Sequence, residues 1–152
     1  MNDMADQPTS VHREWLRELL AELGFRPKEI PGDADGDLTF GYEGKTFWVS
    51  LDRTDPDYLR LIYPGFLVLA PGEEKVALGL CHSMARDTKL LKLWYAEATA
   101  ERPARVSAAI DILGVARCFD GEQLTRMLRL LQRAGNRFIE AMPGPASGSS
   151  PS

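Results

Sequence analysis

The chain has 152 residues, of which 44% are hydrophobic and 26% are charged, and its net charge is −4. This balance is typical of a single globular domain. No run approaches the roughly 18–20 apolar residues of a membrane span, and the first residues are acidic and polar, unlike an export signal. We therefore expect a cytoplasmic protein whose two distant cysteines, Cys81 and Cys118, stay reduced.

The domain is expected to occupy residues 10–142. Residues 1–9 have little to bury, so we expect a flexible N-terminus. Residues 143–152 read PGPASGSSPS and are expected to form a disordered tail, because Pro, Gly and Ser provide no apolar anchor.

The first predicted helix runs from Ser10, its N-cap, to Leu23. Its apolar arc consists of Trp15, Leu16, Leu19, Leu20 and Leu23. Another side carries an acidic row at spacings of four residues, Glu14, Glu18 and Glu22. Gly24 followed by Phe25 predicts a Schellman ending.

Three strands are predicted next. Residues 38–42 and 47–51 alternate apolar and polar side chains, and Gly44 joins them as a hairpin. Residues 57–63 place Leu59, Leu61 and Tyr63 on one face, and Pro64 is expected to end this strand.

The second half of the chain begins with a predicted helix over residues 72–87, which has apolar residues at spacings of three to four. Two further strands are predicted at 90–97 and 105–113, and a final helix follows from its N-cap, Asp120, to Met142. The predicted order is α-β-β-β-α-β-β-α, an α+β domain.

The final helix has two dissimilar faces at about 100° per residue. One side gathers the apolar residues Leu124, Met127, Leu128, Leu131, Ala134, Phe138, Ile139 and Met142. The opposite side carries an arginine row, Arg126, Arg129, Arg133 and Arg137. The apolar face requires a sheet or partner to cover it, whereas the guanidinium groups require water or an anionic surface.

This succession resembles the YbjN-like family, bacterial proteins that share the architecture of class I type III secretion chaperones. The resemblance spans about residues 10–142 and is carried chiefly by two stretches, ALGLCHSMARDTKLLKLWY at 77–95 and FDGEQLTRMLRLLQRAGNRFIEAM at 119–142. In the first a helix runs directly into a strand, and in the second an aspartate-capped helix ends the domain.

The resemblance implies a curved antiparallel five-stranded sheet packed by the first and last helices, commonly in a homodimer. It also implies a non-enzymatic protein that binds other proteins, either as a chaperone of an extended client segment or as a regulator of sensory transduction. No catalytic residue and no cofactor come with it.

Other polar residues give little support to a catalytic or metal site. Asp33, Asp35 and Asp37 gather carboxylates, but the glycine and glutamate positions of an EF-hand loop are not matched, so we expect a polar loop. His12 and His82 have no partner at metal-ligand spacing. Cys118 follows Arg117, which leaves a reactive thiol as an alternative to a small buried residue.

Charge is divided unevenly along the chain. Residues 1–74 carry 7 basic and 15 acidic residues, whereas residues 75–152 carry 11 basic and 7 acidic residues. Opposite charges of this kind can pair within one protomer or between protomers. The arginine row can therefore be an ordinary solvated face, a partner of the acidic row, or a binding surface for an acidic protein.

The sequence thus favours a protein-binding module that is not an enzyme and acts as a homodimer on a client or regulatory partner protein. Besides the arginine row, the candidate contact residues are Trp48 and Tyr58 as anchors on a sheet face and Leu130 at the margin of the last apolar arc. A DNA-contacting regulator and a small-molecule enzyme without a recognisable motif remain the alternatives. Net acidity makes nucleic acid the less favoured partner.

Overall fold

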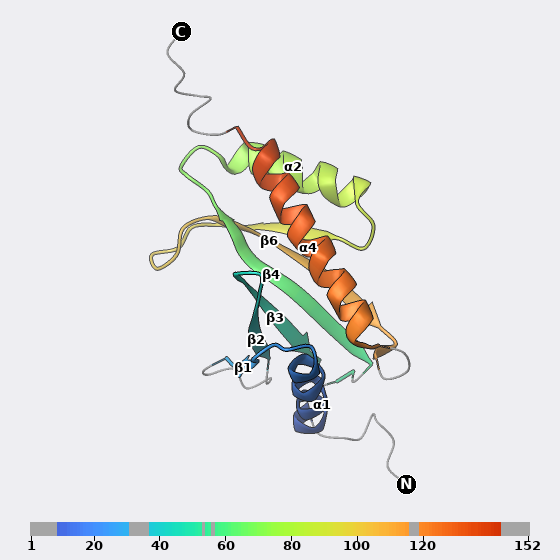
Figure 1. Ribbon diagram of the computed structural model, residues 1–152. Coiled ribbons are helices and arrows are strands. Elements are labelled where there is room, and N and C mark those ends of the chain that lie inside the picture. The colour runs from blue at the N-terminus through green and yellow to red at the C-terminus, as the bar shows by residue number, and fades with distance from the viewer. Residues whose placement is uncertain (1–8, 31–36, 53, 56, 116–118, 144–152) are drawn as a thin grey trace.

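A six-stranded antiparallel sheet forms the frame of the protein, with strands in the order β1-β2-β3-β4-β6-β5 (Figure 1). The computed structural model describes residues 9–30, 37–52, 54–55, 57–115 and 119–143. The strands are β1 (Lys28–Glu29), β2 (Leu38–Tyr42), β3 (Lys45–Leu51), β4 (Tyr58–Val68), β5 (Lys92–Ala96) and β6 (Arg105–Leu113). The helices in this part of the chain are α1 (Thr9–Glu22), α2 (Glu74–Asp87) and α4 (Gly121–Ala141).

The sheet has one buried and one more open face because successive side chains of a strand point to opposite sides. In β4, Leu59, Leu61 and Tyr63 are buried, whereas the residues between them are half-buried. Leu61 pairs with Val49 of β3 and with Ile110 of β6, so the buried rows continue from strand to strand. The predicted alternation is confirmed, and it defines the face that the helices cover.

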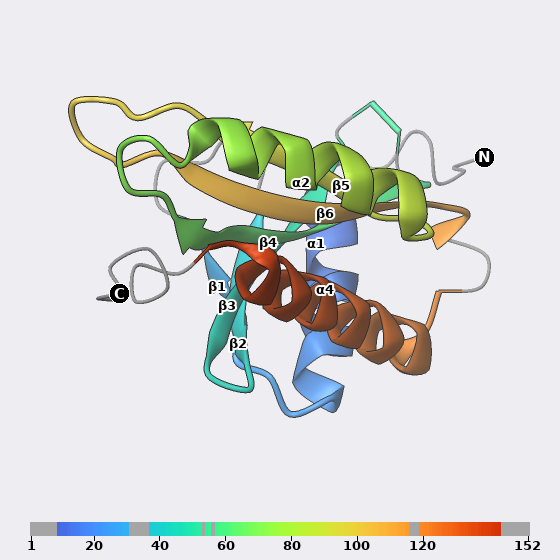
Figure 2. The same ribbon diagram turned by 90° about the horizontal axis from the view of Figure 1, so that it is seen from above.

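Helices α1 and α4 cover the buried face, and α2 lies against the edge strand β5 (Figures 1 and 2). α4 crosses β4 and β6, and its side chains without exposed surface are Leu124, Leu128, Leu131 and Phe138. α1 contributes Leu16 and Leu20. Trp15 and Ile139 were also predicted on apolar faces, but they are 37% and 42% exposed because they lie at the margins of their arcs.

Local hydrogen bonds end α1 and begin α4 as the sequence predicts. The N–H of Phe25 donates to the carbonyl of Leu20, and that of Gly24 donates to Ala21, which is a Schellman ending. Asp120 accepts from the backbone N–H of Gln123 at 2.9 Å, and the Gln123 side chain accepts from the N–H of Asp120 at 3.3 Å. This capping box fixes the first turn of α4.

The expected count of five strands is wrong because the structure adds β1 at the sheet edge. Its two residues pair with Thr39 and Leu38 of β2. Lys28 and Glu29 are both exposed, so no hydrophobic alternation marks this strand in the sequence.

The expected end of the third strand at Pro64 is also wrong, because β4 continues to Val68. The pairing of β4 with β6 is irregular between Tyr63 and Leu67. Gly65 has φ +52° there, and its N–H donates to Ser107 Oγ at 2.8 Å. A proline is compatible with this bulge because the regular ladder is interrupted where its N–H is missing.

The two expected flexible ends, residues 1–9 and 143–152, lie almost entirely outside the described residues. Within the described ranges, every helix is too short or too polar to cross a bilayer.

Candidate partner-binding site

The arginine row lies along the side of α4 that is turned away from the sheet. Arg126, Arg129, Arg133 and Arg137 are all exposed, opposite the buried leucines of the same helix. Within the described part of the chain, none of these four side chains makes an ion pair or a hydrogen bond. The row is therefore a line of exposed cations, and among the described residues the carboxylate that acts on it is Asp87, whose pKa is lowered mainly by Arg86 and also by Arg137.

A groove of about 490 Å³ opens beside this row, between α4 and the turn that leads into β5. Its lining combines three of the arginines with apolar and amide side chains, namely Leu90, Gln123, Arg126, Met127, Arg129, Leu130 and Arg133. Met127 and Leu130 are half-buried, so they form an apolar floor beneath an arginine rim. We call this feature the α4 groove. Its lining suits an amphipathic segment that carries negative charge.

Leu90 closes the groove from the side of α2 and β5 in an unusual conformation. Leu90 is the first residue of the strand predicted at 90–97, but β5 begins at Lys92. Leu90 has φ +65°, in the left-handed region that favours glycine, and it is 70% exposed. An exposed leucine held in this strained conformation contributes apolar surface to the groove at a cost in stability.

The acidic row of α1 does not neutralise the arginine row inside the protomer. Glu14, Glu18 and Glu22 are exposed, and among the described residues no ion pair joins them to α4. Two basic residues of α1 instead form ion pairs with Glu29 of β1, Arg13 at 3.1 Å and Arg17 at 3.4 Å. Pairing of the two rows within one protomer is thus not observed.

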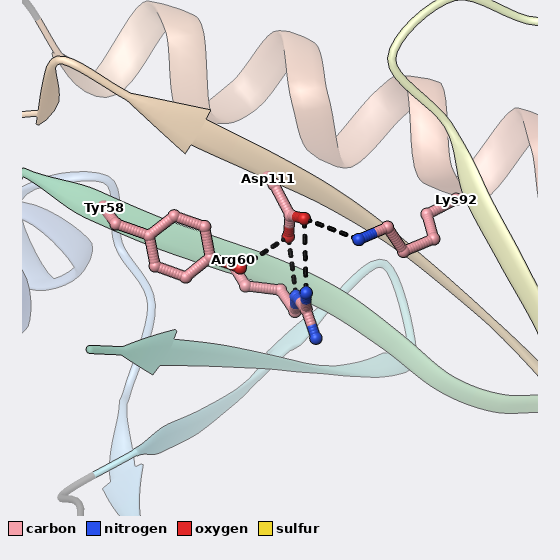
Figure 3. A network of polar contacts seen from close by, with 4 residues as sticks. All are labelled: Tyr58, Arg60, Lys92 and Asp111. Carbon is pink, nitrogen blue, oxygen red and sulfur yellow. Dashed lines mark hydrogen bonds and ion pairs between the residues drawn. The ribbon is translucent and has the colours of Figure 1, made fainter. Parts of the chain in front are cut away.

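A second polar feature lies on the open face of the sheet, where three donors meet one carboxylate (Figure 3). Asp111 of β6 accepts from Tyr58 Oη at 2.9 Å, from Arg60 Nε at 2.6 Å and from Lys92 Nζ at 2.8 Å. A second bond, from Arg60 Nη2 to Asp111 Oδ2 at 3.2 Å, makes the Arg60 contact bidentate.

The electrostatics of this cluster favour the ionised aspartate. Partial burial alone would raise the pKa of Asp111, but hydrogen bonds from Arg60, Lys92 and Tyr58 outweigh it and hold the pKa well below its usual range. Burial and the hydrogen bond to Asp111 raise the pKa of the Tyr58 phenol. The four groups therefore satisfy one another and join three strands.

The predicted sheet-face anchors lie on this open face, in different surroundings. Tyr58 is half-buried and its hydroxyl is engaged by Asp111. Trp48 is half-buried and pairs across the sheet with Ile62. The sequence reasoning missed the polar cluster, although charged residues within otherwise apolar strands were a signal for it.

The remaining candidate residues do not converge. His82 is exposed, and Cys81 is buried in the core, where burial raises the pKa of its thiol. Asp33, Asp35, Cys118 and the His12 side chain lie outside the described parts of the structure. Where the structure is described, no group of three acidic, histidine or cysteine side chains could hold a metal ion.

The architecture is that of a YbjN-like fold. The crystal structure of YbjN from E. coli, which is described as a candidate transcription regulator, superposes with a TM-score of 0.57 and 14% sequence identity. The match covers 84% of this chain and 87% of that one. No family model and no curated protein sequence matches the chain. The likeness establishes the fold, and the function has to be argued from the surface.

Proposed function

We propose that this protein is a non-enzymatic binding module that holds an acidic segment of a partner protein in the α4 groove. The observation that carries the proposal is one concave site that combines an apolar floor with three arginines, which form no ion pair among the described residues. The arginines orient an acidic segment, and Leu90, Met127 and Leu130 receive its apolar side chains. The role is chaperone-like or regulatory, in the cytoplasm and as a homodimer.

The chemistry of the lining supports binding rather than catalysis. Guanidinium groups are permanently charged, and the remaining polar side chain among the described lining residues is the amide of Gln123. None of these groups is a nucleophile or a general base at neutral pH. Bidentate contacts from arginine to carboxylate provide orientation, while contacts with the apolar floor provide most of the affinity.

The regulatory version of this proposal draws support from the fold, because YbjN shares the architecture and is described as a candidate transcription regulator. Contacts with a partner protein are compatible with such a role without any contact with DNA.

The proposal is tested by site-specific cross-linking in the source cell. A photoreactive residue at Leu90 should capture a partner through an acidic segment, whereas the same residue at Leu113, 72% exposed at the end of β6, should not. The fourfold change of Arg126, Arg129, Arg133 and Arg137 to Glu should abolish capture. A matched change of four exposed cations outside the groove, Lys28, Lys45, Lys75 and Arg102, should leave it intact. Equal capture by the arginine variant would contradict the proposal.

A DNA-contacting regulator is the second candidate, because the same exposed arginines could contact phosphates. It predicts retention on duplex DNA that weakens steeply with salt and disappears in the fourfold arginine variant. Absence of retention at low salt removes this candidate.

A further inference from the structure

We propose that, in the absence of a partner, a second copy of the chain covers the arginine row with the acidic row of its α1. Each protomer presents both rows, so the contact is made twice in a symmetric dimer. The inference rests on the proposed function, because it assigns the α4 groove an occupant that a partner protein must displace.

The acidic row and the arginine row have matching spacing along their helices. Glu14, Glu18 and Glu22 recur every four residues on α1, and Arg129, Arg133 and Arg137 recur every four residues on α4. Residues four apart lie on nearly the same side of a helix, about 6 Å along its axis. Two helices laid side by side therefore bring three carboxylates opposite three guanidinium groups.

Most charges of the two rows have no ion pair among the described residues. In the described residues, Glu18 and Glu22 have no ion pair, and Glu14 has one weak contact, 4.0 Å from Arg17 Nε. Among the described residues the arginines have no ion pair either, although Arg137 lies near enough to Asp87 to contribute to the lowered pKa of that carboxyl. The first half of the chain carries most of the acidic residues and the second half most of the basic ones. Because the described part of one protomer does not join these two rows, a second copy offers each row a surface of opposite charge.

The positions of α1 and α4 in the fold allow the contact to be made twice. α1 and α4 cover the same face of the sheet, as both views show (Figures 1 and 2). The acidic and arginine rows lie on the exposed sides of these helices, opposite Leu16 and Leu20 in α1 and Leu128 in α4. A two-fold axis can therefore place α1 of each copy against α4 of the other, in the isologous arrangement of most homodimers.

Self-masking of the α4 groove follows from this arrangement. In an isolated protomer the groove is open, and Leu90 is 70% exposed. In the proposed dimer, α1 of the second copy lies on Arg129 and Arg133, which form part of the groove's rim, and so limits access to it. A partner protein then has to offer an acidic segment that outcompetes α1. Binding of a partner and self-association are consequently coupled, and both weaken with salt.

A charge swap tests the inference by light scattering of the full chain at tens of micromolar. The wild type should be a dimer that dissociates as salt is raised. One variant changes Glu14, Glu18 and Glu22 to Lys, and the other changes Arg129, Arg133 and Arg137 to Glu. Each variant alone sets like charges against each other and should be monomeric. A mixture of the two should form a heterodimer, since both of its contacts again join opposite charges.

Controls separate specific pairing from net charge. Changing Glu43, Glu97 and Glu101 to Lys, or Lys45, Lys75 and Arg102 to Glu, produces the same net charges on exposed residues elsewhere and should leave the dimer intact. Circular dichroism verifies that every variant is folded. A monomeric wild type, or a mixture that stays monomeric, would overturn the inference. Cross-linking of an acidic partner at Leu90 by a monomeric protein would leave partner binding in the α4 groove standing, without the homodimer and without this inference.

Discussion

The ring of Tyr63 in β4 lies directly against the backbone of Gly135 in α4. A Cβ added at Gly135 would come within 2.7 Å of Tyr63 Cε2 and 3.4 Å of Phe66 Cδ1. Glycine inside a helix costs about 1 kcal/mol relative to alanine. Here the absence of a side chain lets the helix approach the sheet closely enough to bury the Tyr63 ring and to cover part of Phe66.

Replacement of Gly135 by Ala should therefore destabilise the protein, by about 1–3 kcal/mol in urea unfolding, because overpacking against Tyr63 exceeds the gain in helix propensity. Gly79 is the control. It lies within α2 with no atom within 4 Å of an added Cβ. Gly79→Ala should stabilise by about 0.5–1 kcal/mol. Stabilisation by both changes would show that α4 does not pack this closely.

The Asp111 cluster should contribute stability that depends on pH. Asp111→Asn removes the charge that holds Arg60 and Lys92 together and should cost about 1–2 kcal/mol at neutral pH. Because the pKa of Asp111 is lowered in the folded state, its contribution is complete above about pH 4, the unfolded value, and disappears as the pH falls through the folded value.

The difference in unfolding free energy between the wild type and Asp111→Asn should thus shrink on acidification below about pH 4. Asp87→Asn is the matched control, because Asp87 also pairs with an arginine, Arg86, but on the exposed surface of α2. It should change stability little at any pH. A constant difference for Asp111→Asn across this range would show that the carboxylate is not held in its charged form.

Leu90→Asn should make the protein more stable and bind its partner less well. Asparagine tolerates the left-handed backbone at φ +65° better than leucine, and little burial is lost from an exposed side chain. We expect a gain of about 0.5–1 kcal/mol in the free energy of unfolding. Leu113→Asn, at a similarly exposed leucine without positive φ, should bring no gain. Loss of stability on Leu90→Asn would argue that Leu90 packs within the fold.

The capping box should account for much of the stability of the first turn of α4. Asp120→Ala removes the side-chain acceptor for Gln123 N–H and should lower the melting temperature, by an amount equivalent to about 1 kcal/mol. Asp120→Ser keeps an acceptor and should restore most of the loss. Equal melting temperatures for Ala and Ser would exclude the cap as the cause.

Element order and helix ends were predictable from the sequence because their causes are local. The Schellman ending at Gly24 and the cap at Asp120 depend on residues within one turn of helix. The continuation of β4 beyond Pro64 was not predictable in this way, since it depends on Ser107 of a distant strand receiving the Gly65 N–H. Strand β1 is held only by its pairing with β2.

One part of the candidate site, the arginine row with Leu130, was predictable from the sequence. Helical spacing alone placed the arginines on one exposed side of α4 and Leu130 at the margin of the apolar face. The groove also required Leu90, which lines it together with Leu130 because of how the segment between α2 and β5 is placed in the fold. The Asp111 cluster required the register that sets Arg60 opposite Asp111, and strand register cannot be read from either strand by itself.

The length of β4 has a consequence for folding of the chain during its synthesis. β4 has 11 residues, and its partner β6 follows much later, with Tyr58 and Asp111 53 residues apart. While the intervening residues are being translated, one edge of β4 has no neighbour and could template association between nascent chains. The bulge forms only when β6 arrives, but Pro64 has no backbone N–H at any stage, so it breaks a continuous hydrogen-bond ladder along this part of the strand from the start.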